Sequence, residues 1–332
     1  RTSRRALRRA ADVRPLRGDR RVVRHLPCRI WAAHAIELPR QRGEQTLAPA
    51  DRGLTRGFNM TERPLLRIID SLRTVEGGGF VVRRPFPTNV VEHIDPFLLL
   101  DEMGPADYAP GKAVGAPSHP HRGFETVTYL LSGSMVHEDT TGAQAVIRPG
   151  GVQWMTAGSG VIHSELPTED LLRLGGRLHG FQLWVNLPAR SKMKDPRYQG
   201  YDAEEITTVP LSHGGVLKIV AGSVHGETGP VETTSPMTYA HAVMNAGDVV
   251  EWAPPASHTA LIHVFDGEVQ VNGHGASAGQ MAVFERAAGA VRVVAGESGA
   301  QVLVLGGEPL NEPVARYGPF VMNTREELVT AV

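Results

Sequence analysis

The sequence predicts an all-β protein in which two antiparallel β-barrels or jelly rolls follow one another, with a short helix at the C-terminus. Segments rich in β-branched and aromatic residues recur along the chain, and clusters of Gly, Pro, Asn and Asp separate them. The 37 glycines and 24 prolines are high for a helical protein of 332 residues and suit one with many turns. Strands at this spacing are typical of barrels and jelly rolls.

The first 59 residues differ from the remainder in composition. Residues 1–59 hold 15 arginines, no lysine and 5 acidic residues, whereas the rest of the chain has 19 basic and 30 acidic residues. Three interpretations are open: a region upstream of Met60 translated through a misplaced start, an Arg-rich targeting peptide, or a nucleic-acid-binding arm. The lack of lysine indicates GC-rich coding and favours the first. We expect residues 1–59 to be a disordered or non-native extension without a part in the function.

The first predicted domain spans residues 60–195. A glycine-rich turn at 77–79 precedes a strand that Pro85 is expected to end, and the apolar run 97–100 indicates a buried strand. A loop from residue 107 to 117 is expected to form a rim. The strands expected after it cover 126–131, 135–138, 145–147, 153–156 and 181–185. The polar, proline-bounded stretch 188–196 is the predicted linker.

The second predicted domain spans residues 196–332 and is again composed of strands. These are expected at 216–222, 237–244, 260–265 and 291–294. Asn272-Gly273 is a hairpin turn signal, and Thr324 begins a capping-box sequence for the C-terminal helix. The histidines after residue 196 are scattered and include no His-x-His pair. We therefore expect no metal site in this domain.

Two pairs of side chains in the first domain have the spacing of metal ligands. His119 and His121 lie one residue apart on an extended segment, so both imidazoles point to the same side and can reach one ion. His163 and Glu165 repeat this spacing after the intervening strands. A single His-x-His is more often surface decoration. Two pairs brought face to face by antiparallel strands predict a metal site of three imidazoles and one carboxylate.

This donor set suits Fe, Mn, Ni, Cu or Zn and leaves two positions of an octahedron open. A closed structural zinc site is usually richer in thiolate, and the chain has no cysteine after Cys28.

The residues beside these pairs have less specific patterns. His137 and Glu138 either support the metal site or lie at the surface, and the sequence does not decide between them. Arg122 either orients an anionic substrate or pairs with Glu125, and the second arrangement is commoner. The aromatic and apolar neighbours of the ligands, Phe124, Trp154 and Met155, are expected to pack the barrel.

The ordered motifs resemble those of the cupin superfamily, and at residue level they resemble the pirin family from Leu65 to the C-terminus. The matching stretches are HPHRGFETVTYLL (119–131), MVHEDTTG (135–142), QWMTAGSGVIHSE (153–165), HGFQLWVNLP (179–188) and GPFVMNTREEL (318–328). The resemblance implies two cupin domains. It also implies iron(II) as the metal and His119, His121, His163 and Glu165 as its ligands. The general cupin pattern would use Glu125 instead, so Glu125 is kept as a residue that supports the ligands.

The resemblance also implies two alternative functions. One is an oxidoreductase of the quercetin 2,3-dioxygenase type, which opens a flavonol ring with O2 and releases carbon monoxide, with Glu165 as both ligand and general base. The other is an iron-dependent regulatory protein that resembles transcription cofactors and acts through a protein partner without turnover. An open apolar pocket at the metal site would favour the first, and a charged patch beside it the second.

Composition excludes several other classes. No stretch approaches the ~18–20 consecutive apolar residues that cross a bilayer, so we expect no membrane span. A single cysteine allows no intramolecular disulfide and favours a reducing, cytoplasmic location. The excess of acidic residues after residue 59 gives no reason to expect direct nucleic-acid binding by the folded part.

Overall fold

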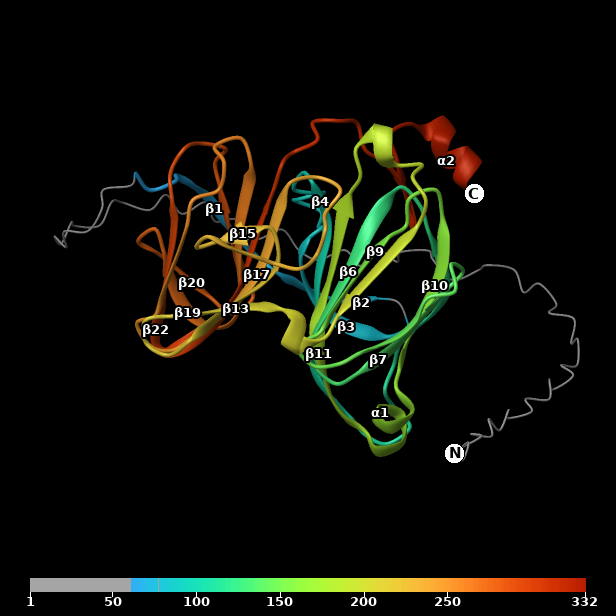
Figure 1. The fold of residues 1–332 in the computed structure, drawn as a ribbon, viewed down its shortest axis with the longest axis horizontal. Coiled ribbons are helices and arrows are strands. Elements are labelled where there is room, and N and C mark those ends of the chain that lie inside the picture. Colours follow the sequence, from blue (N-terminus) through green and yellow to red (C-terminus); the bar gives the residue numbers. More distant parts are fainter. Residues whose placement is uncertain (1–60, 77) are drawn as a thin grey trace, which may run out of the picture. The chain divides into compact units, whose positions relative to one another are not determined.

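The computed structural model describes residues 61–76 and 78–332, and these form a mostly β structure with two main groups of strands (Figure 1). The predicted extension, residues 1–59, lies outside the described residues. Within the described part, no helix has the length and apolar character needed to cross a membrane. The prediction of an all-β fold with antiparallel strands and a short C-terminal helix is confirmed.

The first group contains a seven-stranded and a four-stranded antiparallel sheet. The larger sheet runs in the order β12 (Arg197–Tyr201), β9 (Val152–Thr156), β6 (Phe124–Ser132), β11 (Gly176–Asn186), β4 (Phe97–Tyr108), β3 (Phe80–Phe86) and β2 (Leu72–Glu76). The smaller sheet runs in the order β5 (Ala116–His121), β10 (Val161–Pro167), β7 (Met135–Asp139) and β8 (Gln144–Ile147). The smaller sheet carries both predicted ligand pairs.

The second group is one nine-stranded sheet. Its main path is β1 (Leu65–Asp70), β21 (Gln280–Phe284), β19 (Thr259–Val271), β22 (Val291–Gly307), β17 (Met237–Met244), β14 (Val216–Ala221) and β13 (Thr207–Pro210). In addition, β18 (Val249–Trp252) pairs with β22 and β20 (His274–Ser277) pairs with β19. The long strands β19 and β22 carry register shifts, which let the sheet bend around its own core.

The remaining elements are short. The strand pairs are β15 (Ser223–Val224) with β16 (Glu227–Thr228), and β23 (Ala315–Tyr317) with β24 (Phe320–Met322). The helices are α1 (Glu169–Leu174), α2 (Arg325–Ala331) and the 3-10 turns η1 (Ala189–Ser191) and η2 (Ala203–Glu205). The predicted capping box begins α2: Thr324 Oγ1 accepts from the Glu327 amide at 3.2 Å, and Glu327 Oε2 accepts from the Thr324 amide at 2.9 Å.

Sheet membership crosses the predicted boundary at residues 195 and 196. Although β1 comes first in the sequence, it pairs with β21 of the second group, and in Figure 1 this blue strand lies among the orange ones. Conversely, β12 follows the predicted linker but pairs with β9 of the first group. The division into residues 60–195 and 196–332 stays a prediction of domain boundaries. The strands exchanged across it tie the two groups together.

Two local expectations are revised. The strand expected to end at Pro85 continues to Phe86, because the pairing of β3 with β4 shifts register between Arg83 and Phe86 and so requires no hydrogen bond from the proline nitrogen. The region 107–117 is shorter as a loop than expected, since β4 extends to Tyr108 and β5 begins at Ala116.

The hydrophobic core has two main parts. One lies between the groups and combines side chains such as Val127 and Phe181 from the first with Leu261 and Leu303 from the second. The other fills the second group alone with aliphatic side chains from β14, β17, β19 and β22. The face of the seven-stranded sheet that is turned away from the second group is therefore left to form the predicted metal site.

Candidate metal centre

The three predicted histidine ligands converge in the first group of strands. Strands β5 and β10 pair antiparallel with His163 directly opposite His119, and His121 is two residues further along β5. The candidate ligand atoms of His119, His121 and His163 all lie within 4.8 Å of one another. Within residues 61–76 and 78–332, no other group of three His, Cys, Asp or Glu side chains meets in this way. The expectation that antiparallel strands bring the imidazoles together is confirmed.

Each imidazole contacts a neighbour through Nδ1, which directs Nε2 toward the others. His119 Nδ1 lies 2.7 Å from the carbonyl oxygen of Pro117, and His121 Nδ1 lies 3.4 Å from that of Pro319. His163 Nδ1 lies 3.5 Å from His137 Nδ1. A carbonyl oxygen accepts hydrogen bonds but cannot donate them, so Nδ1 of His119 and of His121 carries a proton, and the neutral ring then has its lone pair on Nε2.

The Nε2 atoms have the separation that a shared ion requires. Those of His119 and His121 are 3.0 Å apart, and two nitrogens bound at right angles about 2.1 Å from one ion would be about 3.0 Å apart. His163 Nε2 is buried and has no hydrogen-bond partner among the described residues. Buried polar atoms are normally satisfied, so a buried nitrogen that has no protein partner and faces two others is suited to bind a cation. The residues fit a divalent metal ion.

Electrostatics also favour the ligand form of these side chains. Burial lowers the pKa of His121 well below its usual value, and the neighbouring charge of His119 adds to the effect. Burial likewise lowers the pKa of His163, followed by repulsion from His121, His119 and His137. Imidazoles whose charged form is disfavoured keep a free lone pair, which is the form that binds metals.

Aromatic rings enclose the site on one side. The ring of Phe124, at the start of β6, meets the His121 ring edge-on with centroids 5.1 Å apart, and the Trp184 ring of β11 lies 5.2 Å from it. Phe124 is fully buried, as expected for a packing residue. These contacts hold His121 in place and keep water from that side of the imidazoles.

Glu165 lies on the same buried face of β10 as His163, because the two are separated by one residue whose side chain points the other way. It is not a member of the imidazole cluster. Its Oε1 accepts from Thr128 Oγ1 at 2.6 Å and from Gln153 Nε2, while Oε2 accepts from Gln182 Nε2 at 3.2 Å. The carboxylate is thus anchored by donors on β6, β9 and β11, and Oε2 is the less heavily bonded oxygen. Sequence reasoning missed these donors.

Glu125 lies on the opposite face of β6 from Thr128, and there it does not contact the ligands. Its carboxylate accepts from Trp154 Nε1 at 3.1 Å and from Thr156 Oγ1 and Thr234 Oγ1 at 2.8 Å each. The expectation that Glu125 supports the ligands is therefore wrong, and the reason is the period of two along β6.

Arg122 does not pair with Glu125 either. Its side chain instead donates to Met193 Sδ at 3.3 Å.

Comparison with protein families identifies this architecture. Residues 79–185 match the family model named Pirin, and residues 239–332 match the model of the pirin C-terminal cupin domain. A pirin-like protein of Caulobacter vibrioides is 42% identical over 274 residues, which are 82% of this chain and 97% of that relative. The chain belongs to the pirin family.

Two solved structures extend the comparison. A structure titled quercetin 2,3-dioxygenase from Acinetobacter baumannii has a TM-score of 0.77 and 37% identity, and the match covers 82% of this chain and 96% of that one. A bacterial pirin from Escherichia coli, solved in complex with nickel(II), has a TM-score of 0.58 and 22% identity, with coverage of 73% and 99%. The second likeness shows the fold alone.

The C-terminal motif of the pirin resemblance supports the metal-site strand. The Val321 amide donates to the Arg122 carbonyl oxygen at 3.0 Å, next to the Pro319 contact with His121. The buried Lys192 donates from Nζ to the carbonyl oxygens of Gly123 at 2.8 Å and Val321 at 3.1 Å. Burial lowers the pKa of Lys192 to about 8. Residues more than a hundred positions apart therefore fix the end of β5, which no spacing in the sequence could show.

The sequence left open whether His137 and Glu138 on β7 support the metal site or lie at the surface. His137 is fully buried beside His163, whereas Glu138 is exposed and faces Gln144. Sequence reasoning missed the partner of His137, Asp139, whose Oδ2 lies 2.9 Å from His137 Nε2. The signal was present, because His137 and Asp139 have the same spacing of two residues as the ligand pairs.

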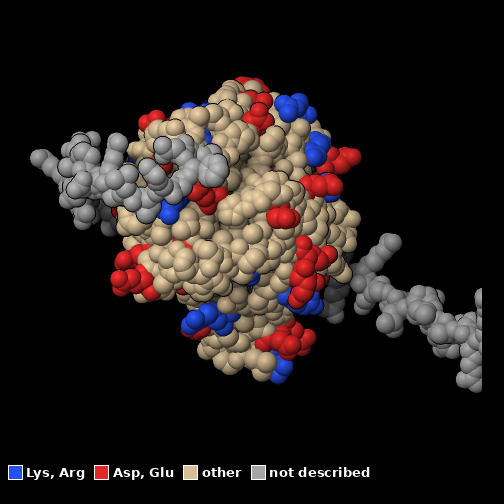
Figure 2. Space-filling view, turned by 60° about the vertical axis from the view of Figure 1, so that its left-hand side comes forward, with Lys and Arg blue, Asp and Glu red and all other residues tan. Residues whose placement is uncertain are grey.

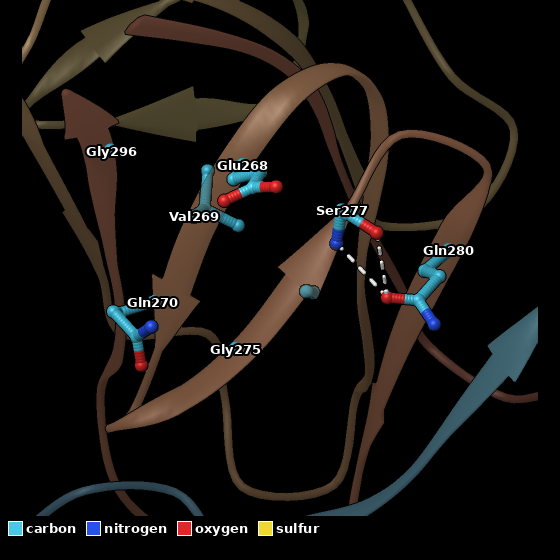
Figure 3. A pocket seen from close by; sticks show the side chains of 8 residues that line it. Glu268, Val269, Gln270, Gly275, Ser277, Gln280 and Gly296 are labelled. Carbon is cyan, nitrogen blue, oxygen red and sulfur yellow. Dashed lines mark hydrogen bonds between the residues drawn. The ribbon is translucent and has the colours of Figure 1, made fainter. Parts of the chain in front are cut away.

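A surface depression of about 300 Å³ in the second group of strands lies away from these side chains (Figure 3). It is formed by β19, β20 and β21, and Ser277 donates from its amide and hydroxyl to Gln280 Oε1 at 3.0 and 3.3 Å. Among the described residues, it holds no cluster of metal-binding side chains. The candidate functional site is therefore the imidazole cluster of the first group.

Proposed function

We propose that this pirin-family protein is a metal-dependent oxidoreductase of the quercetin 2,3-dioxygenase type, which opens the ring of a flavonol with O2. The observation that carries the proposal is the meeting of the His119, His121 and His163 imidazoles on the buried face that also holds Glu165. The likeness to the structure titled quercetin 2,3-dioxygenase at 37% identity supports it.

The proposed ligands are His119, His121, His163 and Glu165, and the proposed metal is iron(II). Imidazole and carboxylate donors suit Mn, Ni, Cu and Zn as well, so the choice of iron rests on the pirin resemblance. When bound, the metal supplies Lewis-acid and redox chemistry toward the flavonol and O2.

The protein residues supply proton transfer and a shielded surrounding. Glu165 Oε1 is occupied by donors from Thr128 and Gln153, whereas Oε2 receives only the longer bond from Gln182. We assign Oε2 as the atom that accepts the proton of the flavonol 3-hydroxyl. Thr128 and Gln153 would hold the carboxylate in place through Oε1 during this transfer.

Access to the site is expected from the side of His119. His121 and His163 are 4% and 2% exposed, whereas His119 is only partly buried. Phe124 and Trp184 line the His121 side and would pack against an aromatic substrate or exclude water from it. We therefore expect a flat polyphenol to enter past His119.

The test is oxygen consumption and carbon monoxide release with a flavonol, using the full chain loaded with iron(II) and the variants Glu165→Gln and Glu125→Gln. The first variant keeps a neutral oxygen but cannot take the proton, so turnover should fall about 100- to 10,000-fold. Glu125→Gln is the matched control on the opposite face of β6, and its effect should stay below the ~10-fold expected for a residue that orients a ligand.

Two outcomes would contradict the proposal. A larger loss in Glu125→Gln than in Glu165→Gln would mean that the active carboxylate is assigned wrongly. A metal-loaded parent that consumes no oxygen with any flavonol would leave the regulatory function, in which the metal state is read by a protein partner without turnover.

A further inference from the structure

A buried pair of side chains outside the ligand set, His137 and Asp139, lies next to the imidazole of His163. Both lie on the inner face of β7, which pairs with β10 so that Asp139 is opposite His163 and His137 is opposite Glu165. Their side chains are 0% and 1% exposed. A charged or polar pair at this depth is costly to bury without a specific partner, and the partner here is His163.

The contacts form a chain of three groups. Asp139 Oδ2 lies 2.9 Å from His137 Nε2, and His137 Nδ1 lies 3.5 Å from His163 Nδ1, at the long end for a hydrogen bond. The ring of Tyr198 on β12 stacks against His137 with centroids 4.7 Å apart and an interplanar angle of 31°. This stacking restricts rotation of the His137 ring, so its two nitrogens stay directed at Asp139 and His163.

Hydrogen-bond roles along this chain allow one arrangement of protons on neutral rings. Asp139 Oδ1 already accepts from the Thr141 amide and hydroxyl at 2.7 and 2.6 Å and from the Ala143 amide at 3.2 Å, as an ionised carboxylate does. Asp139 Oδ2 then requires an N–H from His137 Nε2, which leaves His137 Nδ1 as an acceptor. His163 must donate from Nδ1, and its Nε2 keeps a lone pair directed at the cluster.

The other two imidazoles are oriented differently. His119 and His121 are held by the backbone carbonyls of Pro117 and Pro319, which no side-chain substitution removes. Of the three, only His163 has a side chain as the partner of its Nδ1. The strength of metal binding can therefore be changed through His163 without touching a ligand.

We propose that His137 and Asp139 are positioning residues that fix His163 as the Nδ1–H tautomer and so present its Nε2 to a divalent metal. This inference rests on the proposed metal site but not on the reaction proposed for it. Partners of this kind, which hold the far nitrogen of a ligating histidine, typically change metal affinity about 10- to 100-fold when they are removed.

The experiment measures cobalt(II) and zinc(II) affinity of the full chain by competition with a chelating dye, together with the visible absorption of the cobalt form. His137→Phe keeps a ring for the Tyr198 stack but removes both nitrogens, and Asp139→Asn keeps the shape but removes the charge. Both should weaken affinity about 10- to 100-fold and shift the cobalt bands. The matched control is Glu138→Gln, the exposed neighbour on β7, which should leave affinity and bands unaltered.

His163→Ala serves as the reference for a lost ligand and separates two kinds of failure. If His163→Ala abolishes binding while His137→Phe and Asp139→Asn bind as the parent does, the positioning role is wrong and the metal site stands. If His163→Ala binds as the parent does, the proposed ligand set is wrong and the positioning role falls with it.

If the β7 variants do not fold, nitrogen-15 NMR of the metal-free parent can show which ring nitrogen of His163 carries the proton. A proton on His163 Nδ1 supports the proposal, and a proton on Nε2 overturns it.

Discussion

The two groups of strands share a fold but use opposite faces of their sheets for polar chemistry. In the first group, the imidazole cluster and Glu165 belong to the four-stranded sheet, and the face of the seven-stranded sheet directed away from the second group supplies Thr128, Gln153 and Gln182 around the carboxylate. In the second group, the corresponding interior is filled by aliphatic side chains, including Ala240, Ala242, Ile262 and Val304. These aliphatic side chains offer no donor atom to a metal ion.

The histidines of the second group lie on its other face, where the two groups meet. His241 and His263 are both opposite Leu303 of β22 and so share its side of the sheet, whereas Ile262 and Val304 point to the interior. His241 accepts from Tyr129 of β6, and His263 approaches Glu102 of β4. The comparison indicates that histidines can form a ligand set only where neighbouring strands direct their donors to the same point.

Figure 2 shows how the charged side chains are distributed over one face of the molecule. On the face shown in Figure 2, acidic and basic side chains are scattered and do not gather into a basic patch. Among the described residues visible there, nothing resembles the electrostatic footprint of a nucleic-acid-binding surface.

The largest expected effect distinguishes the histidines of the two groups by metal content. His163→Ala should reduce the metal of the full chain from about one equivalent to almost none, because it removes one of three converging donors. His263→Ala, a matched change of a buried histidine in the second group, should leave the metal content unchanged. Elemental analysis after reconstitution checks both, and a parent holding two equivalents would contradict the comparison.

A second prediction compares glycines with positive φ in the two groups. Gly123, at φ 87°, would place a Cβ 2.0 Å from the Val321 carbonyl oxygen, whereas Gly273, at φ 76° in the β19–β20 hairpin, would meet nothing within 4 Å. Gly273→Ala should cost about 1–2 kcal/mol of unfolding free energy, from backbone strain alone. Gly123→Ala must also displace the backbone of β24 and should cost about 4 kcal/mol or more. Denaturant unfolding measures both, and equal losses would show that β24 yields to the new methyl group.

The contact between the groups should be sensitive to acid through Glu102. Burial raises the pKa of this carboxyl, but contacts with His179, His263 and Arg83 outweigh burial and lower it to about 2 from 4.5. Because the folded pKa is the lower one, the stabilisation is present above pH 4.5 and is lost as the pH falls toward 2. A shift of this size corresponds to about 3 kcal/mol of unfolding free energy.

Glu102→Gln should therefore be less stable than the parent by about 3 kcal/mol at neutral pH, and the difference should shrink in acid. Unfolding by denaturant at neutral pH and at successively lower pH measures it. Asp107→Asn, which breaks an exposed ion pair with Arg177, is the control and should change little at any pH. A difference between parent and Glu102→Gln that does not vary with pH would rule out an ionised Glu102 in the fold.

The smallest expected effect concerns the other polar contact between the groups. Tyr129 is fully buried, and its hydroxyl lies 2.9 Å from His241 Nδ1. Tyr129→Phe should cost about 1–2 kcal/mol, because the buried nitrogen loses its donor, and metal content should not change. Tyr129 is adjacent to Thr128 in sequence but on the opposite face of β6, so a loss of metal in this variant would show that the two faces are coupled.

The sequence by itself determined the fold class, the strands around the metal site and the set of imidazoles that meet there. It did so because side chains in a strand alternate with period 2, so the pairs His119 with His121 and His163 with Glu165 each had to share a face. The same rule, applied to His137, would have singled out Asp139 in place of Glu138. It would also have placed Glu125 and Thr128 on opposite faces of the sheet, since their positions along the strand differ by an odd number of residues.

Only the tertiary structure decided which of the two faces each strand turns toward the metal site, and which distant segments complete it. That choice depends on what packs against the sheet: the second group covers the side of Glu125, Val127 and Tyr129, so the other side is left for the ligands. Several contacts join residues that are far apart in sequence. They are the pairing of β1 with the second group, the pairing of β12 with the first, and the contacts of Pro319 and Val321 with the end of β5. Such contacts are set by the free energy of burying complementary surfaces, which local spacing does not encode.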